Sequence, residues 1–187
     1  MIVKSTELQI NKRIFTESKA ALFYGENDGL KDDFKKEIKK NHSNSEIINL
    51  FSDNILKNKN ILLNEIINLS LFTKEKIIFI FEADDKLIKI IDECVSLEFE
   101  NIKIIIFSRL LDTKSKLRNL FEKNKSLLIV PCYSDTEFQL RNYITKELRN
   151  IKGLNPEMIN LIIYNSSEKR SEIIKEIEKI KLYCENN

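Results

Sequence analysis

The chain has 187 residues, of which 42% are hydrophobic and 32% charged, enough to bury the core of one ordinary domain and a small second one. Its 31 basic and 29 acidic residues give a formal net charge of +2, so the charge total does not predict a strongly basic nucleic-acid-binding protein. No apolar run reaches membrane-spanning length, and the amino terminus lacks the apolar core of a signal peptide. Cys94, Cys132 and Cys184 show no metal or redox spacing, so we expect reduced thiols in a cytoplasmic protein.

Strand-like and helix-like segments alternate over the first two thirds of the chain. Five apolar runs are predicted as strands: Ala20–Tyr24, Glu46–Phe51, Lys76–Phe81, Lys103–Phe107 and Leu127–Val130. Helical periodicity is found in Ser5–Ile14, Leu30–Lys40, Asn60–Leu69, Lys86–Phe99 and Lys114–Lys123. Runs without polar alternation are typical of strands covered on both faces. The fold class is therefore α/β, with a five-stranded, mainly parallel sheet.

The pattern becomes wholly helical from Ser134 onward. A capping box is predicted at Ser134–Glu137, and the helix that it opens is expected to end at Gly153. Asn155 and Pro156 are predicted as the cap and first turn of the next helix. The last helix places four residues on one face: Ile173, Ile177, Ile180 and Cys184. We therefore expect one domain at residues 1–133 and a small helical domain at residues 134–187.

The segment Gly25–Asp33, "GENDGLKDD", has the position of a phosphate-binding loop between a strand and a helix. Such a loop needs G-x-x-x-x-G-K-[ST], with backbone amides around the phosphates and a hydroxyl on magnesium. Here the second glycine comes one residue early, Leu30 takes its place, and Asp32 stands where the hydroxyl belongs. The acidic residues of the loop would also repel a triphosphate. An ordinary loop is favoured, and a degenerate ATP-binding loop that uses Lys31 stays open.

Other candidates for catalysis are weak. The strand end "IFIFEADD" carries Glu82, Asp84 and Asp85, which without a phosphate loop indicate a solvated turn and a helix cap. His42 is the single histidine and lies in a polar stretch, and no Cys/His or Ser/His set is recognisable from spacing. We expect no catalysis, no cofactor and no metal.

Several stretches, in order along the chain, carry a family resemblance. They are "LFYGENDGLKDDF", "NLSLFTKEKIIFIFEADD", "IIIFSRLLDTKSKLRNLFEK", "PCYSDTEFQLRNYITKELRNIKGLNPEMINLII" and "EIIKEIEKIKLY". Together they resemble the delta subunit of the bacterial DNA polymerase III clamp loader. The resemblance implies an AAA+-like domain and a helical lid, with the family's third, collar domain expected to be absent from this chain.

The resemblance also implies a function. Delta subunits lack ATPase activity, and they bind the sliding clamp, the beta subunit, and open it for loading onto primed DNA. The implied contact is the pair Leu71 and Phe72, together with Leu69, Ser70 and Asn68 of "NLSLF", where Asn68 replaces the usual glutamine. The implied partners are the clamp, the other clamp-loader subunits and, through the assembled complex, DNA. The chain would be a non-catalytic subunit of a DNA polymerase (nucleotidyltransferase) holoenzyme.

Three alternatives stay open. Leu71 and Phe72 are large and apolar, so they could instead belong to the core at the end of the sheet. The protein could be a degenerate AAA+ ATPase, in which case changing Lys31 would abolish ATP binding. It could also be a DNA-binding replication factor that uses the lysine-rich "KKEIKK" and "KNKN", in which case binding would depend strongly on salt.

Overall fold

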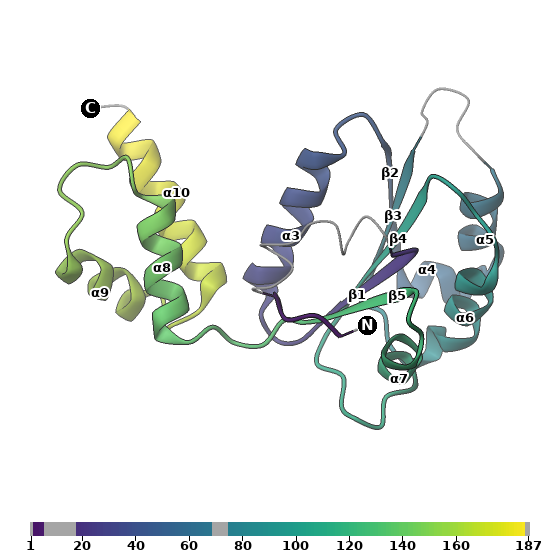
Figure 1. Ribbon diagram of the computed structural model, residues 1–187. Helices are drawn as coiled ribbons and strands as arrows, with labels where there is room; N and C mark the ends of the chain where they lie inside the picture. The colour runs from purple at the N-terminus through teal and green to yellow at the C-terminus, as the bar shows by residue number, and fades with distance from the viewer. Residues whose placement is uncertain (1, 6–17, 69–74, 186–187) are drawn as a thin grey trace. The chain divides into compact units, whose positions relative to one another are not determined.

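The computed structural model describes residues 2–5, 18–68 and 75–185 (Figure 1). Its centre is a five-stranded sheet in the order β2-β3-β4-β1-β5. The strands are β1 (Ala20–Tyr24), β2 (Glu46–Phe51), β3 (Lys76–Phe81), β4 (Ile102–Ser108) and β5 (Leu127–Pro131). Every pairing is parallel, which confirms the α/β class and the five predicted strands to within a residue at their ends.

Eight α-helices and one 3-10 helix are seen in the described part of the chain. They are α3 (Asp28–Asn41), α4 (Ser52–Lys57), α5 (Asn60–Ile67), η1 (Asp85–Leu87), α6 (Ile88–Ser96), α7 (Lys116–Lys123), α8 (Glu137–Glu147), α9 (Pro156–Asn165) and α10 (Arg170–Glu185). The sequence did not predict the six-residue α4. No helix in these ranges is long and apolar enough to cross a membrane.

The chain forms two compact units. One contains Met1–Gly25 and Lys36–Cys132, and the other contains Glu26–Lys35 and Tyr133–Asn187. The division is therefore not a single cut along the sequence, because the first part of α3 groups with the helices that follow Cys132. The predicted boundary between residues 133 and 134 stays a prediction.

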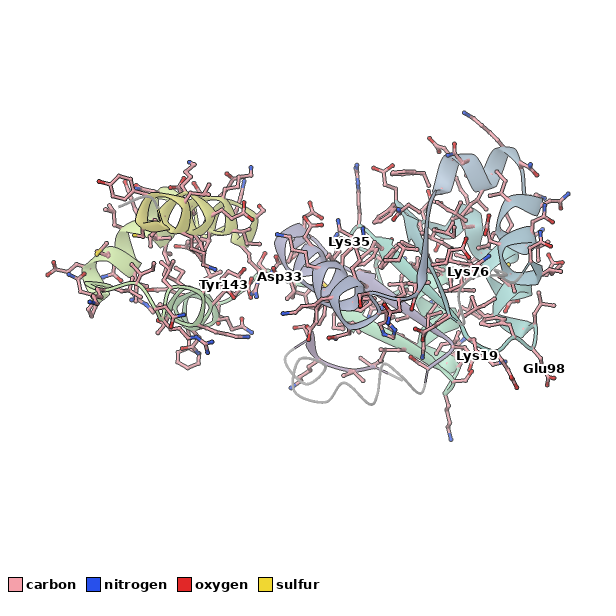
Figure 2. The ribbon with its side chains drawn as sticks, turned by 90° about the horizontal axis from the view of Figure 1, so that it is seen from above. Lys19, Asp33, Lys35, Lys76, Glu98 and Tyr143 are labelled. Atoms are coloured by element: carbon pink, nitrogen blue, oxygen red, sulfur yellow. The ribbon has the colours of Figure 1, made fainter. Side chains whose placement is uncertain are left out.

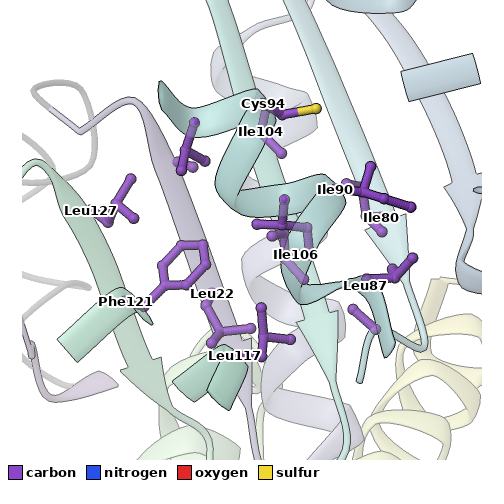
Figure 3. Close-up of a cluster of buried hydrophobic side chains, with 14 of the residues drawn as sticks. Leu22, Ile80, Leu87, Ile90, Cys94, Ile104, Ile106, Leu117, Phe121 and Leu127 are labelled. Atoms are coloured by element: carbon purple, nitrogen blue, oxygen red, sulfur yellow. The ribbon is translucent and has the colours of Figure 1, made fainter. Parts of the chain in front are cut away.

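Helices α4 to α7 cover one face of the sheet (Figure 1). The main core lies beneath them, where strand residues such as Leu22 and Ile106 meet Ile90 of α6 and Phe121 of α7 (Figure 3). Cys94 is buried in the same core, and desolvation, followed by the nearby Glu93 carboxylate, raises the pKa of its thiol to about 12. That thiol is therefore uncharged at neutral pH and packs as a small apolar side chain.

The opposite face of the sheet carries a row of four phenylalanines. Phe51, Phe81, Phe107 and Phe23 stand in register on β2, β3, β4 and β1, with neighbouring ring centroids 5.4–5.5 Å apart. The second half of α3 lies on this face, since Lys39 Nζ is 5.7 Å from the centroid of Phe79. Aromatic pairs at these distances add stability beyond their buried area.

The helical unit has its own core between α8, α9 and α10. Its buried residues are Leu140, Ile144, Leu148, Ile162, Ile163, Ile173 and Ile177. Cys184 is exposed, so the predicted apolar face of α10 does not extend to it. Asn155 and Pro156 begin α9 as predicted, with Asn155 Oδ1 accepting a hydrogen bond from the Met158 amide at 2.8 Å.

The predicted capping box at Ser134–Glu137 is wrong by two residues. The structure forms the box between Thr136 and Gln139, whose side chain and backbone groups bond reciprocally. Ser134 instead donates from its amide to Glu26 Oε1 at 3.0 Å. The helix also ends at Glu147, earlier than the predicted stop at Gly153.

Candidate functional site

The candidate clamp-binding segment is Asn68–Phe72. The structure describes only its first residue, and Leu69, Ser70, Leu71 and Phe72 lie outside the described residues. The assignment of Leu71 and Phe72 as the clamp contact, and the alternative that they are core residues, therefore stay predictions. The structure does describe Asn68, the first residue of the segment, and Glu75, the next described residue after it.

Asn68 is held by a buried lysine. It caps the carboxyl end of α5, with its amide donating to Asn64 O at 2.8 Å. Lys76 Nζ donates to Asn68 O at 2.7 Å, to Glu65 O at 3.1 Å and to Glu65 Oε2 at 3.0 Å. The side chain of Lys76 is 5% exposed. The last carbonyls of a helix have no partner within the helix and carry partial negative charge, so an ammonium group is a favourable ligand there.

Glu75 is held from the other side. Its Oε2 accepts from Ser45 Oγ at 2.6 Å and lies 2.8 Å from His42 Nδ1. Burial alone would raise the pKa of Glu75, but the hydrogen bonds from Ser45 and His42 outweigh it and leave the pKa lowered. The backbone of Glu75 also accepts from the Glu46 amide at 2.9 Å. Asn68 and Glu75 are thus both fixed at the end of the sheet where strands β2 and β3 start.

This polar network was not predicted from the sequence. The sequence offers His42 only as a weak catalytic candidate, whereas in the structure it contacts the carboxylate of Glu75, the residue before β3. The predicted strand Lys76–Phe81 gives Lys76 no separate role, and its isolated charge inside "EKIIFIF" is the signal that could mark it as buried and paired. A lysine in such a run must find partners, because burying an unpaired charge is costly.

The segment Gly25–Asp33 lacks the features of a phosphate-binding loop in the structure as well. Gly25 has φ 137°, and a Cβ there would clash with the backbone of Cys132. A Cβ on Gly29 would lie 2.6 Å from the amide nitrogen of Ser171. Lys31 is 8% exposed, and its Nζ is paired with Asp28 Oδ1 at 2.8 Å. The two glycines therefore serve close packing within the chain, and the lysine is neutralised locally.

A network of ion pairs and hydrogen bonds involves the start of α3. It contains Arg170, Asp33, Asp135 and Asn27, and we call it the Arg170 network. Arg170, with a side chain 7% exposed, donates from Nε to Asp33 Oδ2 and from Nη1 to Asp135 Oδ1, both at 2.8 Å. Asn27 Nδ2 donates to the second oxygen of Asp135 at 2.7 Å, and Asn27 Oδ1 accepts from the Leu30 amide at 3.0 Å. An amide that a phosphate would need is thus already bonded to a side chain of the same chain.

Tyr143 completes the Arg170 network. The guanidinium carbon of Arg170 lies 4.0 Å from the centroid of its ring, a cation–π contact. Its hydroxyl donates to Asp33 Oδ1 at 3.4 Å, and Figure 2 shows these two side chains next to each other. Burial, followed by the charge of Asp33, raises the pKa of Tyr143. The tyrosine therefore stays neutral and acts as a donor throughout the physiological range.

The acidic strand end after β3 is used for capping, as the sequence indicated. Asp84 Oδ1 accepts from the Lys86 amide at 2.9 Å. Asp85 accepts from Ser115 Oγ at 2.6 Å and from the Lys116 and Leu117 amides at 3.0 and 2.9 Å. Among the described residues, no group of His, Cys, Asp and Glu is arranged to hold a metal ion.

Comparison with solved structures finds the Bacillus subtilis DNA clamp loader delta protein, with a TM-score of 0.60 at 9% sequence identity. The match covers 96% of this chain and 57% of that protein, so the chain spans little more than half of the delta protein's length. A structure of Drosophila ORC bound to DNA matches with a TM-score of 0.50 at 12% identity, over 87% of this chain and 55% of that one. No protein-family model matches the chain, and no curated protein matches it in sequence.

At these identities the likeness establishes the fold. The chain has the fold of a clamp loader delta protein over nearly its whole length, so the resemblance inferred from the sequence motifs is confirmed at the level of architecture. The function does not follow from the fold alone.

Proposed function

We propose that this chain acts as a delta-type clamp-loader subunit in DNA replication, binding the sliding clamp without hydrolysing ATP. The observation that carries the proposal is the fold shared with the Bacillus subtilis delta protein over 96% of the chain. The bonding of the loop Gly25–Asp33 supports a non-hydrolysing role, because the Leu30 amide and the Lys31 ammonium group, which a phosphate loop would turn to a triphosphate, are bonded within the chain. Its partners would be the clamp, the other loader subunits and, through the assembled complex, primed DNA, all in the cytoplasm.

Clamp binding would depend on the candidate segment Asn68–Phe72. Leu71 and Phe72 would enter an apolar pocket on the clamp, each contributing roughly 1.5–3 kcal/mol by burial. The anchoring of Asn68 by Lys76, and of Glu75 by His42 and Ser45, supports this role, because a fixed base lowers the entropic cost of binding. Opening the ring needs no chemistry from this subunit. It needs tighter binding to the open clamp than to the closed one.

The test is a calorimetric titration of the chain with the cognate sliding clamp. Replacing Leu71 and Phe72 by alanine should weaken binding by at least about 100-fold, because two buried side chains are lost. The matched control replaces Leu182 and Tyr183, a leucine–aromatic pair that is exposed on α10, by alanine. That control should bind like the unmodified chain. Equal affinity for the Leu71/Phe72 variant, with an unchanged circular dichroism spectrum, would refute the proposed contact.

A further inference from the structure

A shallow groove of about 780 Å³ lies between α6 and α7. The residues that line it are Ile88, Asp92, Lys116, Asn119, Leu120, Lys123, Asn124 and Lys125. None of its lining residues belongs to the candidate segment Asn68–Phe72 or to the Arg170 network. We call it the α6–α7 groove.

Helical spacing explains how α7 forms one wall of the groove. Lys116, Asn119, Leu120 and Lys123 stand at positions i, i+3, i+4 and i+7, which lie on one face of a helix. The adjoining face, with Leu117 and Phe121, packs into the main core (Figure 3). Helix α7 therefore has two faces. One is apolar and packs into the core, and the other carries Lys116, Asn119, Leu120 and Lys123 and lines the groove.

The groove has an apolar floor. Ile88 of α6 and Leu120 of α7 are only partly buried, and both pack against the main core from outside. Their remaining accessible surface faces a ring of polar side chains. An apolar floor with a polar rim is the usual composition of a site that binds a peptide or another protein surface.

The rim carries an excess of positive charge. Lys116, Lys123 and Lys125 are exposed, and none of the three forms a salt bridge within the described part of the chain, whereas Asp92 is the one acidic side chain in the lining. The nearest acid along α7, Glu122, is bonded to Arg118 at 2.7 Å. Asp85, whose charge acts on Lys116, already accepts three hydrogen bonds at the start of α7.

Some lysines on other helix surfaces are paired within the chain. Lys175 bonds to Glu172 and Lys179 to Glu176, each three residues away on α10. By contrast, no carboxylate of the described residues lies within salt-bridge distance of the three groove lysines, and Glu122 is taken up by Arg118, so their charge is available to an external acidic group. Charge complementarity therefore favours a partner that presents carboxylate groups to these lysines.

From these features we propose that the α6–α7 groove docks an acidic segment of another protein, in which Leu, Ile or Phe side chains stand among Asp and Glu. The apolar residues would cover Ile88 and Leu120, and the carboxylates would face the three lysines. A nucleic acid fits less well, because it offers no aliphatic side chains to cover Ile88 and Leu120, and three lysines are few for a backbone-binding surface. The inference is independent of the proposed clamp contact.

The experiment measures fluorescence anisotropy of a short labelled peptide in which Leu and Phe stand among Asp and Glu, titrated with the full chain. Binding should weaken about tenfold or more in the variant K116E/K123E/K125E. It should weaken similarly when the Leu and Phe of the peptide become Ser. The matched control, K40E/K57E/K59E, reverses three exposed lysines outside the groove and should bind like the unmodified chain.

Three results would overturn the proposal. They are no binding of the acidic peptide, binding that K116E/K123E/K125E leaves unchanged, and preferential binding of an oligo-dT strand that this variant abolishes. The last result would assign the groove to nucleic acid. Because the clamp titration uses different residues, a failure here leaves the proposed clamp contact standing, and the reverse also holds.

Discussion

At the scale of single residues, Lys76 is a buried charge with several partners. Its ammonium group meets two carbonyl oxygens and the Glu65 carboxylate, and Glu46 Oε2 lies 3.7 Å away. Lys76 is the buried member of this cluster, and its removal would leave the carbonyl oxygens of Glu65 and Asn68 without their donor. Lys76 should therefore matter for stability as well as for the position of Asn68.

Replacing Lys76 by methionine should lower the free energy of unfolding by about 3 kcal/mol, since it leaves Glu65, Glu46 and the end of α5 without their cation. Urea unfolding at neutral pH measures the change. The control, Lys86→Met, removes an exposed lysine 3.8 Å from Asp84 and should cost less than about 0.5 kcal/mol. Similar losses in the two variants would contradict the structural role given to Lys76.

At the scale of elements, α7 begins on a carboxylate from another part of the chain. Burial would raise the pKa of Asp85, but the hydrogen bonds from Ser115, Leu117 and Lys116 outweigh it and lower the pKa. A carboxyl whose pKa is lower in the folded state stabilises the fold above its unfolded pKa. That stabilisation is lost as the pH falls through the folded value.

Asp85→Asn should therefore reduce the free energy of unfolding at pH 7 by about 1 kcal/mol, as loss of a helix cap does. The difference from the unmodified chain should shrink as the pH falls below about 4, the ordinary pKa of an aspartate, and should vanish at still lower pH, where Asp85 is protonated in the folded state as well. Urea unfolding across this pH range measures it. Glu100→Gln, at an exposed position, serves as the control. A difference that stays constant with pH would show that the charge of Asp85 is not what stabilises α7.

The elements also show what could be read from the sequence. The five strands were predictable because an unbroken apolar run between turn residues has few other uses. The six-residue α4 was missed because it is too short to show a helical period. The capping box was misplaced because "SDTE" and "TEFQ" overlap as patterns, and only the structure shows that Thr136 is the cap.

At the scale of the whole molecule, the members of the Arg170 network were the hardest residues to predict. Asp33 and Arg170 are 137 positions apart, and Asn27 and Asp135 are 108 apart, so no local pattern reveals that they meet. The broken phosphate loop could be recognised from spacing alone. That Asn27 and Asp33 of this loop bond to Asp135 and Arg170 could not be recognised.

Adding millimolar ATP with magnesium should leave the melting temperature unchanged, because a ligand that binds the folded state would raise it. Arg170→Met should lower the free energy of unfolding by about 3 kcal/mol, since Asp135 is 5% exposed and would lose its cation. ATP should not restore that loss. An ATP-dependent rise in melting temperature that Lys31→Ala abolishes would instead support the ATPase alternative.

The grouping of Glu26–Lys35 with the later helices has a practical consequence for anyone who dissects the protein. A peptide that starts at Tyr133 would keep Arg170 and Asp135 but leave behind Asp33 and Asn27, which bond to them. Excised in that way, the three helices would lack one of the two carboxylate partners of Arg170 and the amide partner of Asp135, and would fold poorly. Joining the ten residues Glu26–Lys35 to these three helices should restore a stably folded fragment.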